Sequence, residues 1–558
     1  MSLQDVQEVP NKTAPVVRSA VIVSALVLLV LLLSTYLLLR PPLFNYDGYV
    51  YRLEALQPAQ GDCINPHHLL WYPIQRAIAK VASMAGSPTP ESFQLFGIAV
   101  NSIALVLCYL LLVHLTKRLV LPFLLTIFIA FSPRIWHLGL QNQPYPLLDL
   151  CVVVFLWAAA GASAPCGVRL VVGGLALAAA VFLQQGMALV VPAVAVGLVL
   201  VGAGPLKSRL KLAVAWAGAT TLVVVAMYAL MARIAGVTPS GFLHWTMGYL
   251  QSQHGIQFDW QLSPIKTVIG VLGTVLDIGG LRDMYNQQKN GEFFWRLYGG
   301  LALAACAAAV LLLARRRVRE RLMGLLRSNL LFTSIVMLML GWSLFVILWE
   351  PAGYYWSVEL FPVAVLVSMW LRASRPRTVL LVGSALLAAS GWNLYANHER
   401  DEAYSVSFPP PLIKQIRKQL RPEDVFIVAG KEWYNDIDYD LLLTCMGDWP
   451  RSPARALLDD YVKPGSGERW QQKLDGDIRD VFEAGGRVFV ADHVFWRDTY
   501  DDLEQVESPY SEYAREEYAG VNGRKLQAEI QSFFDRYNLS ESGFRIADDR
   551  YWELKPAK

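Results

Sequence analysis

Long apolar runs separated by short polar interruptions fill residues 1–399 of this 558-residue chain. The first run, Val21 to Leu39, contains no charged residue and is long enough to cross a bilayer, which takes about 20 helical residues. It ends at Arg40 without the small residues of a cleavage site, so we expect a retained first helix. The whole pattern predicts eleven spans, at residues 20–40, 93–115, 119–133, 145–160, 168–183, 187–203, 211–234, 293–314, 329–349, 355–372 and 378–395.

Residues 400–558 have the pattern of an ordinary soluble domain. Two apolar stretches, 425-VFIVAG-430 and 487-RVFVAD-492, alternate with helical patterns at 410–420 and 471–484. This alternation predicts a parallel sheet built from βαβ units. No glycine-rich phosphate loop follows either strand, so nucleotide binding has no support. The fold class is therefore a polytopic α-helical membrane protein with a C-terminal α/β domain.

The distribution of charge predicts which ends of the spans face the cytoplasm. The chain carries a net charge of +3, and the acidic excess of nine in residues 400–558 leaves a basic excess of twelve in residues 1–399. That excess gathers in short connections, where positive charge marks the cytoplasmic side, so it is no footprint of nucleic-acid binding. The connections are Lys117-Arg118, Arg169, the group Lys207, Arg209 and Lys211, 315-RRRVRER-321 and 372-RASRPR-377.

An odd number of spans then places the two ends of the chain on opposite sides of the bilayer. We expect a cytoplasmic N-terminus at 1–19, a transmembrane domain at 20–399 and an outer domain at 400–558, periplasmic or luminal. A bacterial inner membrane is the expected location. Two long loops, 41–92 and 235–292, also fall on the outer face, whereas the outer turn 184-QQG-186 is too short to matter much structurally.

The first outer loop carries two acidic residues that could do chemistry. Asp47 lies just beyond the first span, and if residues 47–56 form a helix, Glu54 shares a face with it. Two such carboxylates could act as a general base and its helper, or bind a divalent cation. Equally, Asp47 could cap the helix, and Glu54 could pair with Arg52 or Arg76.

His67 and His68 follow in the same loop and lead into residues 69–85, whose amphipathic pattern predicts an interfacial helix. Two adjacent histidines on a regular helix cannot easily bind one metal ion. One of them could hydrogen-bond a substrate phosphate; the alternative is that both only make the surface polar.

Further polar and aromatic residues fall at the outer ends of later spans. Arg134, His137 and Gln141 lie in the expected outer turn 134–145. An arginine there can hold a phosphate bidentately, or it can anchor the chain at the interface. Glu350 begins another outer turn, and Glu359 falls inside the following span, where a carboxylate needs a partner or a water-filled cavity. The nearby rings could stack on a sugar or form an interfacial belt: Trp349, Tyr354, Tyr355 and Trp356.

Loop 235–292 contains an apolar stretch at 265–281 that we expect to be an interfacial helix, with a re-entrant segment or twelfth span as the alternative. Cys63 and Cys445 fall on the outer side, where an oxidising compartment would let them pair, although two unrelated thiols fit as well. No Cys-x-x-Cys or zinc spacing occurs, so no metal ligands are assigned.

The segments 47-DG-48 and 65-NPHHLL-70, placed after a first span in an eleven-span plan, resemble the polyprenyl-phosphate-sugar-dependent glycosyltransferases of the GT-C fold. Protein O-mannosyltransferases and lipid A aminoarabinose transferases show an acidic pair after the first helix, followed by a His-Pro or Pro-Pro turn. Here Gly48 stands in the second acidic position, which leaves Glu54 as the substitute. Residues 142-NQPY-145 also lack the glutamate that many relatives carry at that point, so a divalent cation is not assigned as a cofactor.

The resemblance implies a transferase that inverts the anomeric carbon. Asp47 would act as general base on an acceptor hydroxyl, and the donor would be a polyprenyl-phosphate sugar whose tail lies between the spans. The departing phosphate would be held by Arg134, His67 or His68, or by a basic residue of loop 235–292 such as Lys266 or Arg282. The acceptor would be a glycan, a lipid or a protein.

Three other classes remain open. A transporter usually shows inverted repeats and polar residues in the middle of spans, whereas polarity here collects on one face. A polysaccharide polymerase or O-antigen ligase would centre on a later outer loop, which His244 and His254 could supply. A non-catalytic scaffold would use the outer domain to bind a partner.

Overall fold

The computed structural model describes most of the apolar part of the chain and a core of the C-terminal part. The described residues are 14–40, 48, 51, 55, 64, 66–84, 90–161, 165–201, 204–251, 263–276, 320, 323–327, 329–349, 354–372, 376–407, 421, 424–428, 455–457, 469–495, 523–546 and 549–556. They fall into two units, one made of Met1–Arg40, Ile64–Tyr72 and Gln94–Asp401, the other of Pro41–Cys63, Pro73–Phe93 and Glu402–Lys558.

Six described helices are long and apolar enough to cross a membrane, and a bent pair of helices makes a seventh candidate. The six are α1 (Ala14–Leu38), α4 (Pro90–Thr116), α8 (Cys166–Leu183), α10 (Leu206–Ile234), α16 (Leu330–Trp349) and α18 (Pro376–Ser407). Three shorter helices fall at other predicted spans: α7 (Tyr145–Ala160), α9 (Val190–Val201) and α17 (Leu360–Arg372). The predicted span at 293–314 lies outside the described residues. The chain is thus a polytopic helical membrane protein.

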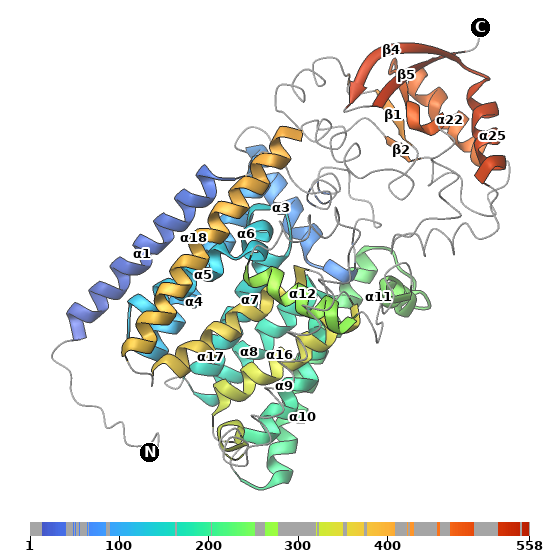
Figure 1. Ribbon diagram of the computed structural model, residues 1–558. Coiled ribbons are helices and arrows are strands. Elements are labelled where there is room, and N and C mark those ends of the chain that lie inside the picture. Colours follow the sequence, from blue (N-terminus) through green and yellow to red (C-terminus); the bar gives the residue numbers. More distant parts are fainter. Residues whose placement is uncertain are drawn as a thin grey trace. The chain divides into compact units, whose positions relative to one another are not determined.

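Five helices of the first unit form a closed set of neighbours (Figure 1). Helix α7 packs on α8, α8 on α10, α10 on α9, α9 on α16, and α16 returns to α7. The packing requires glycine where backbones approach closely: a Cβ at Gly341 of α16 would lie 2.8 Å from the Cα of Val190 in α9. These close approaches fix the ends of the helices, which carry the polar and aromatic residues considered below.

Two of the basic connections meet at one end of the first unit. The Arg118 guanidinium donates to the carbonyl oxygen of Arg372 at 3.5 Å, and Arg372 donates to that of Leu115 at 3.2 Å. The sequence placed both connections on the same, cytoplasmic side of the bilayer. Their contact shows that the two connections lie at the same end of the helices.

The prediction of an outer turn at 134–145 is wrong for the first half of that segment, because residues Pro133–Leu140 form helix α6. Helix α5 (Val120–Phe131) ends at Ser132, whose backbone is extended, and α6 restarts at Pro133 with a bend of 65°. The break frees carbonyl groups that side chains from distant helices satisfy. Tyr36 donates to Ala130 at 2.9 Å and Asn397 to Phe131 at 3.1 Å. A broken helix is tolerated at membrane depth when its polar groups are satisfied in this way.

Residues 355–372 also differ from the continuous span that the sequence predicted. Residues Tyr354–Glu359 form a 3₁₀ helix, η4, and α17 starts only at Leu360. The expected helix in loop 235–292 is present as α12 (Ser263–Val275), after α11 (Phe242–Gln251). Helix α12 packs on α6 and η4. The amphipathic helix expected after the histidines is α3 (Trp71–Met84), preceded by the 3₁₀ helix η2 (Pro66–His68).

The second unit contains a five-stranded mixed sheet in the order β2-β1-β3-β5-β4. The predicted strands are present as β1 (Val425–Val428) and β3 (Val488–Ala491); they pair in parallel, and helix α22 (Arg469–Glu483) precedes β3. The prediction of a purely parallel sheet is wrong, because β5 (Asp549–Lys555) pairs antiparallel with β3 and with β4 (Asn538–Ile546). Strand β2 (Arg455–Leu457) forms the other edge, and helix α25 (Gly523–Phe534) precedes β4.

A buried ion pair fixes the start of both parallel strands. The Asp424 carboxylate is fully buried, accepts from the Arg487 guanidinium at 2.6 Å and from the backbone amides of Arg421 at 2.8 Å and Arg487 at 3.0 Å. An amide side chain can replace only part of this set, because it has one acceptor oxygen. We therefore expect Asp424→Asn to lower the free energy of unfolding of this unit by about 1–3 kcal/mol.

Denaturant unfolding followed by the near-UV signal of the unit's buried aromatic residues measures the Asp424→Asn effect. Asp477→Asn, on α22 and outside this set of bonds, is the matched control. Equal stability of the two variants would contradict the role given to Asp424.

Candidate functional site

Six aromatic and histidine side chains come together at one end of the first unit. This His–aromatic cluster consists of His67, His68, Tyr145, Phe345, Trp349 and Tyr355. They come from η2, the start of α7, the end of α16 and η4. Three of these positions fall at span ends, and η2 falls in the loop 41–92; the charge pattern predicts that all four face outward. Three residues chosen from the sequence, His67, His68 and Tyr355, therefore lie in one place.

The rings form a continuous chain of contacts. The His67 ring stacks on Trp349 at a centroid distance of 5.8 Å, and Trp349 stacks on Phe345, also at 5.8 Å. Tyr355 meets Phe345 edge-on at 6.0 Å and Tyr145 at 5.9 Å. Aromatic faces of this kind bind the apolar faces of sugars and also cations.

His68 has a fixed tautomer when it is neutral. Its Nδ1 lies 2.6 Å from the carbonyl oxygen of Leu183, and because a carbonyl can only accept, Nδ1 carries the hydrogen. Nε2 is then an acceptor atom in the neutral ring and a second donor in the protonated ring. Such a histidine can hold a phosphate oxygen in its protonated form.

The turn between α8 and α9 is central to this region, although from its sequence it was expected to be too short to matter much structurally. Residues Gln185–Leu189 form the 3₁₀ helix η3, and a Cβ at Gly186 would lie 2.5 Å from the Phe345 ring. On its other side, the turn begins at Leu183, which accepts the His68 bond. The turn is thus held between η2 and α16, the two elements that carry His67, His68, Phe345 and Trp349.

Glu359 is a buried carboxylate that the sequence placed inside a span and gave no role. It is 7% exposed, ends η4 and accepts from the Ser343 hydroxyl of α16 at 2.8 Å. The Trp342 indole donates to the carbonyl oxygen of Tyr355 at 2.8 Å. These two bonds attach η4 to α16 and so position the Tyr355 ring. A glutamate inside a predicted span was the available sequence signal.

We expect Glu359→Leu to weaken substrate binding about tenfold with little change in kcat, because it removes one of the two hydrogen bonds that position η4. Glu359→Gln keeps an acceptor oxygen for Ser343 and should remain close to wild type. Steady-state kinetics of both variants, beside Ser343→Ala, measure the difference. A Gln variant as impaired as the Leu variant would show that the negative charge itself is needed.

The other residues predicted for the site lie nearby or outside the described part. Arg134 and His137 are on α6 and Gln141 follows it, 5% exposed; α6 packs on both α7 and η4. Asp47, Glu54 and Glu350 lie outside the described residues, as do both cysteines of the expected pair, Cys63 and Cys445. So do Arg282, His254 and the Lys266 side chain. Among the described residues, no group of three or more His, Cys, Asp or Glu could hold a metal ion.

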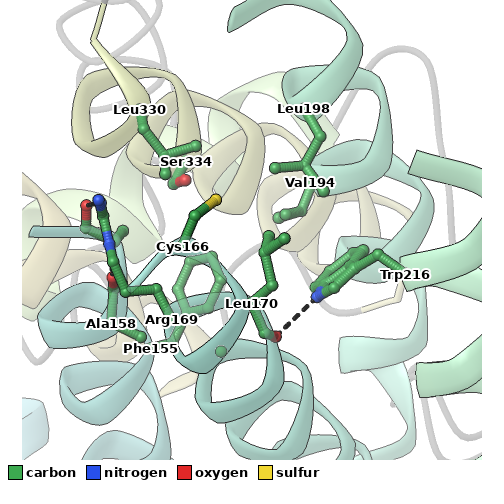
Figure 2. A pocket seen from close by; sticks show the side chains of 12 residues that line it. Phe155, Ala158, Cys166, Arg169, Leu170, Val194, Leu198, Trp216, Leu330 and Ser334 are labelled. Carbon is green, nitrogen blue, oxygen red and sulfur yellow. Dashed lines mark hydrogen bonds between the residues drawn. The ribbon is translucent and has the colours of Figure 1, made fainter. Parts of the chain in front are cut away.

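A separate small pocket lies at the opposite end of α7 and is not part of this site (Figure 2). It is lined by Ala158, Cys166, Leu170 and Trp216 among others, and its volume of about 30 Å³ leaves room for only one or two water molecules. Trp216 donates to the Leu170 carbonyl there at 2.9 Å. Since α7 rises about 1.5 Å per residue, the pocket is roughly 20 Å from Tyr145. It has no room for a sugar.

The overall architecture matches known structures over nearly its full length. ArnT from Cupriavidus metallidurans, whose crystal structure holds undecaprenyl phosphate, aligns with a TM-score of 0.53 over 97% of this chain and 98% of its own, at 11% identity. The fold is that of the GT-C membrane glycosyltransferases. The resemblance expected from the sequence is therefore confirmed at the level of fold.

The archaeal oligosaccharyltransferase AglB from Archaeoglobus fulgidus, in complex with an inhibitory peptide and a dolichol-phosphate, also aligns. Its TM-score is 0.43 over 94% of this chain and 74% of its own, at 13% identity. No protein-family model matches the sequence, and no curated protein matches it. The GT-C fold and the residues gathered at one end of its helices are thus the basis for assigning a function.

Proposed function

We propose that the chain is an integral membrane glycosyltransferase that moves a sugar from a polyprenyl-phosphate donor to a glycan, lipid or protein acceptor. The observation that carries the proposal is the near-full-length match to ArnT, which binds undecaprenyl phosphate in its crystal structure. The His–aromatic cluster supports it, because it gathers aromatic rings, which suit a sugar, and two histidines, which suit a phosphate, at one end of the helices. The reaction takes place on the outer face of the membrane.

In this mechanism Asp47 is the general base. Its carboxylate takes the proton of the acceptor hydroxyl while that oxygen attacks the anomeric carbon of the sugar. The bond from the anomeric carbon to the phosphate oxygen breaks on the opposite face, so the configuration is inverted. Polyprenyl phosphate leaves as an anion, and protonated His67 or His68, with Arg134 from α6, stabilises its charge. Glu54 assists Asp47.

Binding of the lipid phosphate tests this function directly. The purified chain in detergent is expected to retain undecaprenyl phosphate in native mass spectrometry and to release it when a polyprenyl-phosphate sugar is added, since both occupy one site. Undecaprenol, which lacks the phosphate, is the control ligand and should bind much more weakly. Equal retention of both lipids would show that only the apolar tail is recognised, which would contradict the proposal.

A further inference from the structure

Gln184 is a buried glutamine whose side chain has no hydrogen-bond partner among the described residues. It is 0% exposed, and both its Oε1 and its Nε2 are without partners there. Its backbone is fully used: the amide donates to Ala180 at 2.9 Å, and the carbonyl accepts from Met187 at 3.0 Å. Only the side-chain amide of Gln184 therefore lacks hydrogen-bond partners among the described residues.

An unpaired buried carboxamide destabilises the folded state relative to the same group in water. Native proteins rarely leave such a group without a hydrogen-bond partner, so an unpaired one calls for an explanation, such as a functional role or a group that completes its hydrogen bonds. Gln184 lies at the Leu183–Gly186 turn, which is bracketed by the His68 bond to Leu183 and by the Phe345 ring against Gly186. Gln184 thus follows a residue that is hydrogen-bonded to the His–aromatic cluster and precedes the turn that packs on it.

The donor and acceptor atoms of the carboxamide determine which ligand group suits it. A phosphate only accepts hydrogen bonds and would leave Oε1 unpaired, whereas a cation would engage Oε1 and leave Nε2 unpaired. A sugar hydroxyl both donates and accepts, so one or two hydroxyls satisfy both ends of the carboxamide. We propose that Gln184 is a specificity-determining residue that hydrogen-bonds the hydroxyl groups of the transferred sugar. The inference rests on the proposed function and names the part of the donor that this turn recognises.

The neighbouring Gln185 provides a matched control. Its Nε2 donates to the carbonyl oxygen of Thr246 at 2.9 Å and so ties η3 to α11. Replacing either glutamine with Met keeps the length and removes the amide. Gln184→Met removes no hydrogen bond of the free protein, so its melting temperature should equal or exceed that of wild type. Gln185→Met removes a bond and should lower the melting temperature.

The test compares the affinities of the full chain in detergent for undecaprenyl phosphate and for undecaprenyl phosphate carrying a hexose or a pentose. Gln184→Met is expected to bind the best sugar-bearing lipid about 10- to 100-fold more weakly and the bare lipid phosphate as wild type does. Gln185→Met should bind both lipids as wild type does, despite its lower melting temperature.

Several results would overturn this role for Gln184. Loss of stability in Gln184→Met with both affinities intact would make it a structural residue, and equal weakening for both lipids would assign it to the phosphate or the tail. Equal affinity of wild type for the bare and the sugar-bearing lipids would show that the protein does not recognise the sugar. Failure of wild type to bind any of these lipids would instead remove the proposed function, and the inference with it.

Discussion

Replacing Asp47 with Asn is expected to lower the rate of sugar transfer by about 10²- to 10⁴-fold, the usual contribution of a positioned general base. Asn has the size of Asp but cannot take the acceptor proton. Donor binding should remain near the wild-type value, because the base contacts the acceptor rather than the lipid phosphate. The measurement is single-turnover transfer from a bound polyprenyl-phosphate sugar, which separates chemistry from binding.

Glu54→Gln is the matched comparison for Asp47→Asn, because it removes the other carboxylate of the same loop. Its effect should be smaller, since Glu54 only assists. A full rate in Asp47→Asn together with a severe loss in Glu54→Gln would move the base to Glu54. Full rates in both variants would contradict carboxylate base catalysis from this loop.

Replacing His68 with Ala is expected to reduce transfer by about 10²- to 10³-fold, the cost of removing one donor to a developing oxyanion. The loss has two physical causes. The phosphate loses the protonated ring that stabilises its charge, and Leu183, at the start of the Leu183–Gly186 turn, loses its hydrogen bond from His68. Affinity for undecaprenyl phosphate should fall with the rate, which distinguishes this variant from Asp47→Asn. Affinity measurements and transfer rates on the same preparation check both expectations.

His114→Ala is the control for His68→Ala. His114 is on α4 and its ring contacts Trp157 of α7, at the end of these helices opposite the His–aromatic cluster. It should leave transfer and lipid affinity unchanged. A His68→Ala variant with wild-type affinity and rate would remove the histidine from phosphate binding, and the role would pass to His67 or Arg134.

The membrane architecture could be predicted because apolar runs and basic connections are local signals. Runs such as Val21–Leu39 directly show helices of spanning length, and β1 and β3 were visible as apolar strands bounded by charge. The end of the third span was predicted at residue 133, but the restart of the chain as helix α6 directly after Ser132 was not. It depends on side chains from α1 and α18, Tyr36 and Asn397, that satisfy the freed carbonyls, and no local pattern reports partners so distant in sequence.

Only part of the candidate site could be predicted, for a related reason. His67 and His68 were chosen by residue type in the predicted outer loop 41–92, and Tyr355 at the outer end of a predicted span; the structure brings the three together. Gln184 was overlooked because a turn as short as 184-QQG-186 is uninformative until the burial of its residues is known. Glu359 was noticed as a carboxylate near a membrane span, but its bond to Ser343 appears only when η4 is placed on α16.

The measurement that tests the central claim most directly is sugar transfer itself. Purified wild-type protein in nanodiscs is incubated with a panel of polyprenyl-phosphate hexoses and pentoses and with a bacterial envelope extract as the source of acceptors, and the released polyprenyl phosphate is quantified. We predict that polyprenyl phosphate is released only when both a suitable donor and the extract are present. We also predict that Asp47→Asn abolishes this release. Tight binding of the donors by wild type without any release, across the whole panel and with acceptor present, would contradict the assignment as a glycosyltransferase.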